Sequence, residues 1–313
     1  MIKKLPILKT LTIFGLLSGF AYAQNSPQAM CGTDIVQEDI FKKNPELRKV
    51  YQAKIKEFEQ SRKERKISRK SNQVIEVPVV VHILDDGTGK YIPTEAQVNA
   101  WIARANAIFD GSASDIKGPG SGGTTLPVKL VLAKRTPSCT STNGIITEDL
   151  STNQTYVDSG IASGGAGVSY SVINNTYNWD SNSYFNIYIT NKINGVNPST
   201  PGITSYTAGF ATFPGQSVDL SVMLYDVVIK QKDTTLAHEM MHAFGVKHVF
   251  ATDDEDGSDD GYGKTCGGVN NDGIADTQQT RSGWFFGSSV NQNGEYNQYK
   301  VYPDNNTIND CTN

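Results

Sequence analysis

Three of the chain's four histidines, His238, His242 and His248, lie within eleven residues, and Glu239 directly follows the first of them. Residues four apart on a helix share a face, so His238 and His242 can bind one Zn²⁺ through nitrogens at about 2.0–2.1 Å. Gly245 allows the backbone to leave the helix in a left-handed conformation, which returns His248 to the metal. The spacing therefore predicts a catalytic zinc site with three imidazole ligands and one open position.

The open position and the neighbouring carboxylate predict a hydrolase. Zinc lowers the pKa of a water that it holds toward about 7, and Glu239 can accept the proton. The implied reaction is hydrolysis of a peptide bond. A bare HExxH pattern also occurs without zinc. Here, however, the hydroxyl residues Thr234 and Thr235 could cap a helix that a glycine ends, which is the context the motif requires.

The first residues, 1–23, have the pattern of an export signal. Lys3 and Lys4 precede an apolar stretch, and Ala21 and Ala23 mark a cleavage site before Gln24. We therefore expect a secreted protein. No later stretch approaches the roughly 20 apolar residues of a transmembrane helix. The net charge of −4 argues against nucleic acid as a partner.

The composition changes near residue 72. Residues 34–70 are rich in charged side chains with apolar residues at helical spacing, which is typical of one or two helices. The chain after residue 72 is rich in strand-forming residues. We therefore divide the mature chain into a helical prosegment, residues 24–73, and a catalytic domain, residues 74–313.

Within the catalytic domain, residues 94–110 predict an amphipathic helix that opens with a capping box of Thr94 and Gln97. The patterns of four segments predict strands, at 77–84, 128–133, 185–190 and 221–225. This order of elements before the zinc helix predicts a mixed α/β (α+β) layer domain. The fourth histidine, His82, lies among valines in the first strand, and we expect it to be a core residue rather than a ligand.

The HExxHxxGxxH sequence is the metzincin signature, and the chain resembles the pappalysin family of metzincins, in particular its secreted, ulilysin-like bacterial branch, the cytophagalysins. Residues 77–84 resemble the family's opening strand, and residues 186–189 its strand leading to the substrate edge. Residues 266–279 resemble a segment that follows the zinc helix. The resemblance implies an endopeptidase with a twisted sheet and the zinc helix at the floor of a cleft. Protein or peptide substrates would bind in extended form along an edge strand.

The resemblance also implies latency. Cys31, Gly32 and Thr33 match a Cys-Gly-Thr sequence near the start of the family's prosegments. A Cys31 thiolate could occupy the fourth zinc position until the prosegment is removed. The alternatives are a disulfide or an idle thiol. The basic run at residues 61–70 predicts cleavage near Arg69 or Lys70.

Calcium is a further implication, because the family resemblance places this ion near Asp272, Asp276 and Thr277. Carboxylate and carbonyl oxygens suit such a hard cation. We expect the acidic residues 253–260 to form a solvated loop instead. Cys266 and Cys311 could form a disulfide, which would leave Cys139 without a partner.

The sequence departs from the metzincin pattern in one respect. Metzincins place a methionine turn beneath the zinc site, but no methionine follows Met241, so we expect the chain to be truncated before that turn. If the turn is naturally absent, the protein could be an incompetent zinc-binding remnant that serves as a binding module. A zinc hydrolase acting on a non-peptide substrate is a second alternative.

Overall fold

The computed structural model describes residues 27–64, 73–116, 119, 123–214 and 218–248. The signal segment, the cleavage site, the calcium candidates and the pair Cys266 and Cys311 lie outside these residues. Within the described part, no helix is long and apolar enough to cross a membrane. Cys31 and Cys139 are both free thiols.

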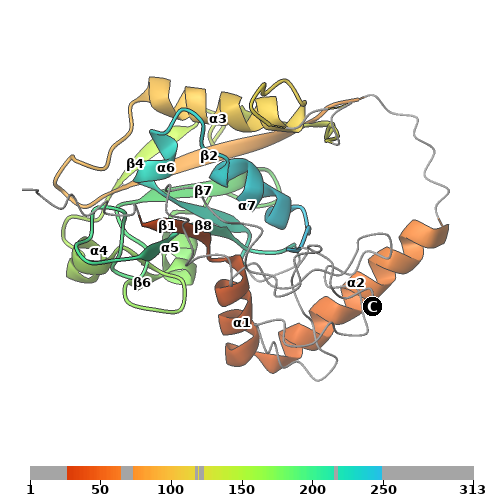
Figure 1. Ribbon diagram of the computed structural model, residues 1–313, viewed down its shortest axis with the longest axis horizontal. Helices are drawn as coiled ribbons and strands as arrows, with labels where there is room; N and C mark the ends of the chain where they lie inside the picture. Colours follow the sequence, from red (N-terminus) through yellow and green to blue (C-terminus); the bar gives the residue numbers. More distant parts are fainter. Residues whose placement is uncertain (1–26, 65–72, 117–118, 120–122, 215–217, 249–313) are drawn as a thin grey trace, which may run out of the picture.

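A seven-stranded mixed sheet forms the centre of the catalytic domain (Figure 1). Its order is β1-β8-β9-β7-β2-β3, with β4 paired to the second half of β2 beyond β3. All pairs are parallel except β8 with β9. The strands are β1 (Gln28–Cys31), β2 (Ile75–Asp85), β3 (Val128–Leu132), β4 (Ile145–Asp149), β7 (Phe185–Thr190), β8 (Ser205–Ala211) and β9 (Leu220–Leu224). A separate pair joins β5 (Ile161–Ala162) and β6 (Val168–Ser169).

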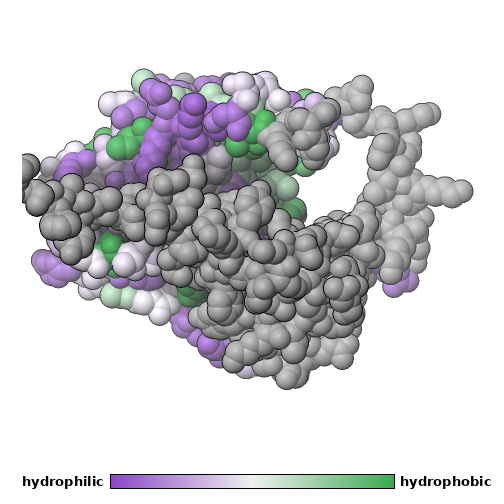
Figure 2. Space-filling model, viewed as in Figure 1, coloured by the Kyte–Doolittle hydropathy of each residue, from purple (hydrophilic) through white to green (hydrophobic). Residues whose placement is uncertain are grey.

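The helices cover both faces of this sheet. α3 (Glu95–Phe109), α6 (Tyr225–Val228) and α7 (Thr235–Ala243) form one layer, in which α3 packs on β3 and α7 packs on β8 and β9. On the opposite face, α5 (Tyr170–Tyr177) reaches β8 through an edge-to-face contact between Tyr170 and Phe210. The short α4 (Gln154–Ser159) lies near β6. The outer side of α3 is hydrophilic, as expected for a helix with one apolar face (Figure 2).

The predicted strands and the predicted helix are confirmed. β2 is three residues longer than the segment 77–84, and its centre is buried because both faces are covered. α3 has the expected capping box, in which the Gln97 N–H donates to Thr94 Oγ1 and the Thr94 N–H to Gln97 Oε1. The apolar face of α3 is buried, as expected for an amphipathic helix, and consists of Val98, Trp101, Ile102, Ala105 and Phe109.

The charged N-terminal region forms two helices, α1 (Thr33–Lys43) and α2 (Pro45–Glu64), after the strand β1. β1 pairs with β8 and so covers the edge of the sheet. The two helices form a hairpin beside the C-terminal end of α7 (Figure 1). Tyr51 of α2 packs against Phe41 of α1 and against Phe213 of the catalytic domain. Residues 27–64 are therefore docked on the rest of the described chain by a strand and by an apolar hairpin.

Candidate metal centre

The helix that bears the first two histidines, α7, is held over the sheet by its apolar face. Leu236 and Met240 are buried, and the helix packs on β8 and β9. The expectation that Thr234 or Thr235 caps the helix is wrong. Thr234 makes no side-chain cap bond, and the Thr235 N–H donates to Asp233 Oδ1 at 2.7 Å instead. A carboxylate binds the first amides of a helix more strongly than a hydroxyl does, because it is charged.

The helix ends at Ala243, and Gly245 turns the chain away from it as the sequence predicted. Its φ is +93°, in the left-handed region. The Gly245 N–H donates to the His242 carbonyl at 2.8 Å, and the Val246 N–H donates to the Met241 carbonyl at 2.9 Å. These two bonds are a Schellman motif, which reverses the chain at the end of the helix. The reversal carries His248 back toward the face that His238 and His242 share.

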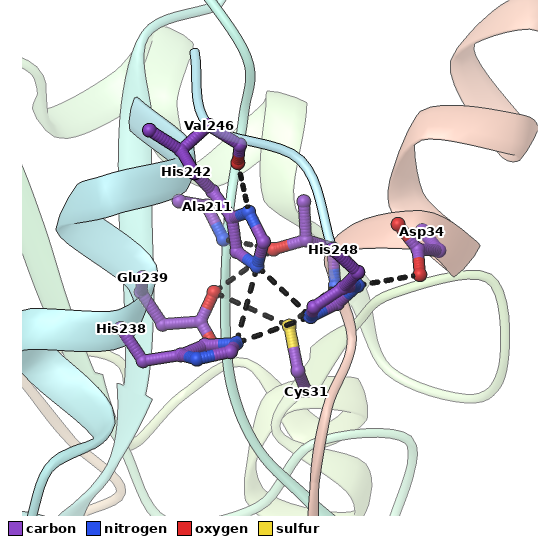
Figure 3. A network of polar contacts seen from close by, with 9 residues as sticks. Cys31, Asp34, Ala211, His238, Glu239, His242, Val246 and His248 are labelled. Carbon is purple, nitrogen blue, oxygen red and sulfur yellow. Dashed lines mark hydrogen bonds and ion pairs between the residues drawn. The ribbon is translucent and has the colours of Figure 1, made fainter. Parts of the chain in front are cut away.

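The three histidine side chains converge on one point (Figure 3). The Nε2 atoms of His238 and His242 are 3.1 Å apart, those of His242 and His248 also 3.1 Å, and those of His238 and His248 3.2 Å. The corners of such a triangle lie about 1.8 Å from its centre, so one ion slightly off the plane reaches all three at the roughly 2.0–2.1 Å of zinc–imidazole bonds. The spacing fits a zinc ion.

The protonation of the imidazoles supports the same conclusion. His242 Nδ1 donates to the Val246 carbonyl at 2.7 Å, and His248 Nδ1 donates to Asp34 Oδ2 at 2.8 Å. Burial, with the neighbouring histidines adding, lowers the pKa of His238 and of His242 to about 4. Near pH 7 these two rings are therefore neutral. Because the Nδ1 atoms of His242 and His248 hold the protons, their Nε2 lone pairs face each other, an arrangement that a shared cation stabilises.

Glu239 lies beside this triangle and is fully buried. Burial raises the pKa of its carboxyl from its usual value of 4.5 to about 7. One oxygen, Oε2, accepts a hydrogen bond from Thr33 Oγ1 at 2.9 Å and one from Cys31 Sγ at 3.5 Å. The other, Oε1, has no partner among the described residues, although a buried carboxylate oxygen is costly to leave unpaired. An unpaired carboxylate oxygen beside three converging imidazoles fits a site in which a water molecule or a substrate group donates a hydrogen bond to Glu239.

Cys31, at the end of β1, supplies the sulfur of the cluster. Cys31 Sγ and the three histidine nitrogens all lie within 4.8 Å of one another. Without a cation, burial and the Glu239 carboxylate raise the pKa of the Cys31 thiol. Gly32 lets the chain approach β8, since a Cβ there would lie 2.7 Å from Thr207 Cγ2. The predicted convergence of Cys31 on the histidines is thus present in the geometry.

Two residues at the start of α1 contact the site, and the sequence did not predict these contacts. Thr33 is fully buried, and its hydroxyl accepts from the Ala211 N–H at 3.0 Å while it donates to Glu239. Asp34 holds His248 through the hydrogen bond described above. The only signal for either was position, because both directly follow the Cys-Gly pair. Their contacts depend on how α1 begins, which no local pattern encodes.

His82 lies outside the cluster, as predicted. It is fully buried, with Nδ1 at 3.1 Å from Glu148 Oε1 and Nε2 at 3.1 Å from Asn186 Oδ1. Residues 186–189, expected to lead to the substrate edge, belong to the interior strand β7. The strand nearest the zinc helix and paired with the prosegment is β8, which the sequence analysis did not identify.

Comparisons with known proteins agree with this geometry. Residues 168–310 match the model of the family Peptidase_M43, described as pregnancy-associated plasma protein-A. A mutant of promirolysin from Tannerella forsythia is similar in structure, with 22% sequence identity, 79% of this chain and 75% of that chain covered, and a TM-score of 0.54. Mature mirolysin in complex with a cleaved peptide, from the same organism, covers 65% of this chain and 71% of its own at 22% identity, with a TM-score of 0.45. A search of curated proteins found no match.

The mixed sheet, the active-site helix and the histidine triangle define a metzincin, a zinc metalloendopeptidase. The family model that residues 168–310 match is that of the pappalysins, and these residues include the whole HExxHxxGxxH sequence.

Proposed function

We propose that the protein is a secreted endopeptidase, made as a latent proenzyme, in which Glu239 is the general base and His238, His242 and His248 hold zinc. The observation that carries the proposal is the triangle of Nε2 atoms beside the buried Glu239 carboxyl. The family is one of metallopeptidases, and the residues of its signature are all present in this chain.

Zinc bound there supplies Lewis acidity, which polarises a peptide carbonyl and acidifies water. Glu239 holds and moves the proton. Its carboxyl can accept a proton from the attacking water through Oε1, which has no partner among the described residues, and later donate it to the leaving amine. The backbone of β8 positions the substrate, because an extended peptide can add to its free edge once β1 has left. Protein or peptide substrates in extended form are therefore the proposed partners.

The test of this function uses protein from which the prosegment has been removed. Cleavage of casein should be abolished by a zinc chelator and restored by added zinc. Glu239→Gln should lower kcat at least about 100-fold while zinc remains bound, since general-base catalysis contributes roughly 10²–10⁴-fold. Glu76→Gln is the matched control, because Glu76 is an exposed residue of β2 paired with Lys129. Full zinc content without any peptidase activity in the parent protein would favour the incompetent binding module.

Latency through Cys31 is the second part of the proposal. A bound dication favours the thiolate, which overcomes the effect of burial on the Cys31 pKa. Cys31 would then hold the fourth position on the metal as a thiolate and keep water from it. Cys31→Ala should raise the activity of the uncut chain, with Cys139→Ala as the control for loss of a thiol. Unchanged latency in Cys31→Ala would remove the proposal.

Export by residues 1–23, maturation near Arg69 or Lys70, and a calcium site at Asp272, Asp276 and Thr277 remain proposals from the sequence. The amino-terminal sequence of the secreted, active protein tests the first two, and a start upstream of Arg62 would contradict the cleavage site. Selective removal of calcium with zinc retained should lower the melting temperature. An unchanged melting curve would count against a calcium site.

A further inference from the structure

Asp34, in the first turn of α1, contacts the third ligand of the metal centre. Its Oδ2 lies 2.8 Å from His248 Nδ1, and the His248 side chain is only 9% exposed. We propose that Asp34 is a positioning residue which fixes His248 for metal binding, so that the prosegment assists zinc loading in addition to closing the site. This inference depends on the proposed zinc site but not on latency or on peptidase activity.

The three ligands differ in what holds them. His238 and His242 stand on α7, whose backbone hydrogen bonds fix their Cα positions, and the Val246 carbonyl orients the His242 ring. His248 lies six residues beyond His242, past the Schellman turn and outside any helix or strand. The orientation of its ring therefore depends on side-chain contacts, of which the bond to Asp34 is a short, charge-assisted one.

The chemistry of the contact favours metal binding. A carboxylate that accepts from Nδ1 keeps the proton on that nitrogen and leaves the Nε2 lone pair directed at the metal. It also increases the electron density of the ring and hence its strength as a ligand. Removing such a partner typically weakens metal binding 10- to 100-fold.

α1 places Asp34 with little freedom. The residue before it, Thr33, is fully buried and hydrogen-bonded to Glu239 and Ala211, and Val36 is buried in the core. An acidic residue in the first turn is also favourable for the helix dipole. The carboxylate is therefore preorganised for His248 rather than recruited to it. Proteolytic removal of the prosegment would take this support from the third ligand.

The experiment measures zinc affinity by chelator competition in the full-length proenzyme. All proteins carry Glu239→Gln, so that self-cleavage does not interfere. We expect Asp34→Ala to weaken zinc binding 10- to 100-fold, and Asp34→Asn, which keeps an acceptor without the charge, to fall between it and the parent. The matched control is Asp39→Ala, because Asp39 is on the same helix and pairs with Lys43 at 2.6 Å, away from the site. It should change the affinity less than twofold.

Cobalt provides a second readout that does not depend on activity. The visible absorption of Co²⁺ reports the ligand geometry, and it should change in Asp34→Ala but not in Asp39→Ala. Zinc affinity and cobalt spectra of Asp34→Ala and Asp34→Asn equal to those of the control would overturn the inference. Failure of the parent proenzyme to bind zinc would instead overturn the proposed metal centre, and this inference with it. Thermal melting of the metal-free variants shows whether each one is folded.

Discussion

The hydroxyl of Thr33 joins the prosegment to the catalytic base, and its removal gives a quantitative test of how the site is closed. Thr33→Val keeps the shape of the side chain and deletes both hydrogen bonds. The bond to the Glu239 carboxylate is worth about 1.5–3 kcal/mol and the one from the Ala211 amide about 0.5–1.5 kcal/mol. A total of about 2–4.5 kcal/mol corresponds to a roughly 30- to 2,000-fold increase in the population in which the prosegment is undocked.

The assay is alkylation of Cys31 by iodoacetamide in the uncut proenzyme, resolved by mass spectrometry. The partly buried Cys31 should react mainly when the prosegment opens, so its rate reports the open population. The exposed Cys139 serves as an internal control, whose rate should not change. We expect Thr33→Val to raise the rate for Cys31 by the factor above and Thr33→Ser, which keeps the hydroxyl, to remain close to the parent. Equal rates in Thr33→Val and the parent, or equal effects of Val and Ser, would refute the reasoning.

Three further predictions concern stability and metal binding. His82→Leu should lower the free energy of unfolding by about 2–4 kcal/mol in urea titrations, because it deletes both hydrogen bonds of a fully buried ring, to Glu148 and to Asn186. No loss would contradict the assigned contacts. Gly245→Ala should cost about 1 kcal/mol, because an L side chain is strained at φ +93°, and should weaken zinc in chelator competition. In the metal-free proenzyme, burial raises the pKa of Glu239 to about 7, so folding takes up a proton and stability falls as pH rises from about 4.5 to about 7. Glu239→Gln takes up no such proton. Its free energy of unfolding, measured by denaturant titration, should therefore increase relative to that of the parent between about pH 4.5 and about pH 7. A difference between the two proteins that does not change with pH would argue against the raised pKa of Glu239.

Local patterns predicted the elements whose signals are local. The capping box and apolar spacing of α3, the valine run of β2 and the glycine stop of α7 each lie within a few consecutive residues. The ligand set could be predicted for the same reason, since eleven consecutive residues hold all three histidines. The resemblance to a family supplied Cys31, which residue spacing alone would not have connected to a site more than 200 residues away.

The elements that escaped prediction have no such local signal. β8 contains two alanines and a glycine, and it is a strand because β9 and β1 pair with it on either side. β1 is only four residues long and is defined by its pairing with β8. The roles of Thr33 and Asp34 likewise follow from docking of the prosegment, which brings residues far apart in sequence together.

The strand and hairpin of the prosegment have a consequence for the kinetics of activation. Residues 27–64 hold the catalytic domain by β1 pairing, by buried Val36, Ile40, Phe41 and Tyr51, and by the contacts at the metal centre. A cut in the connector to β2 breaks none of these interactions. It removes only the covalent link between the two parts. Before the cut, the catalytic domain meets the N-terminal segment at an effective concentration in the millimolar range; after it, the segment can rebind only at its concentration in solution. Under the proposed latency, the nicked protein is a two-chain inhibitory complex, and the onset of activity should follow dilution or digestion of the released peptide rather than the cut itself.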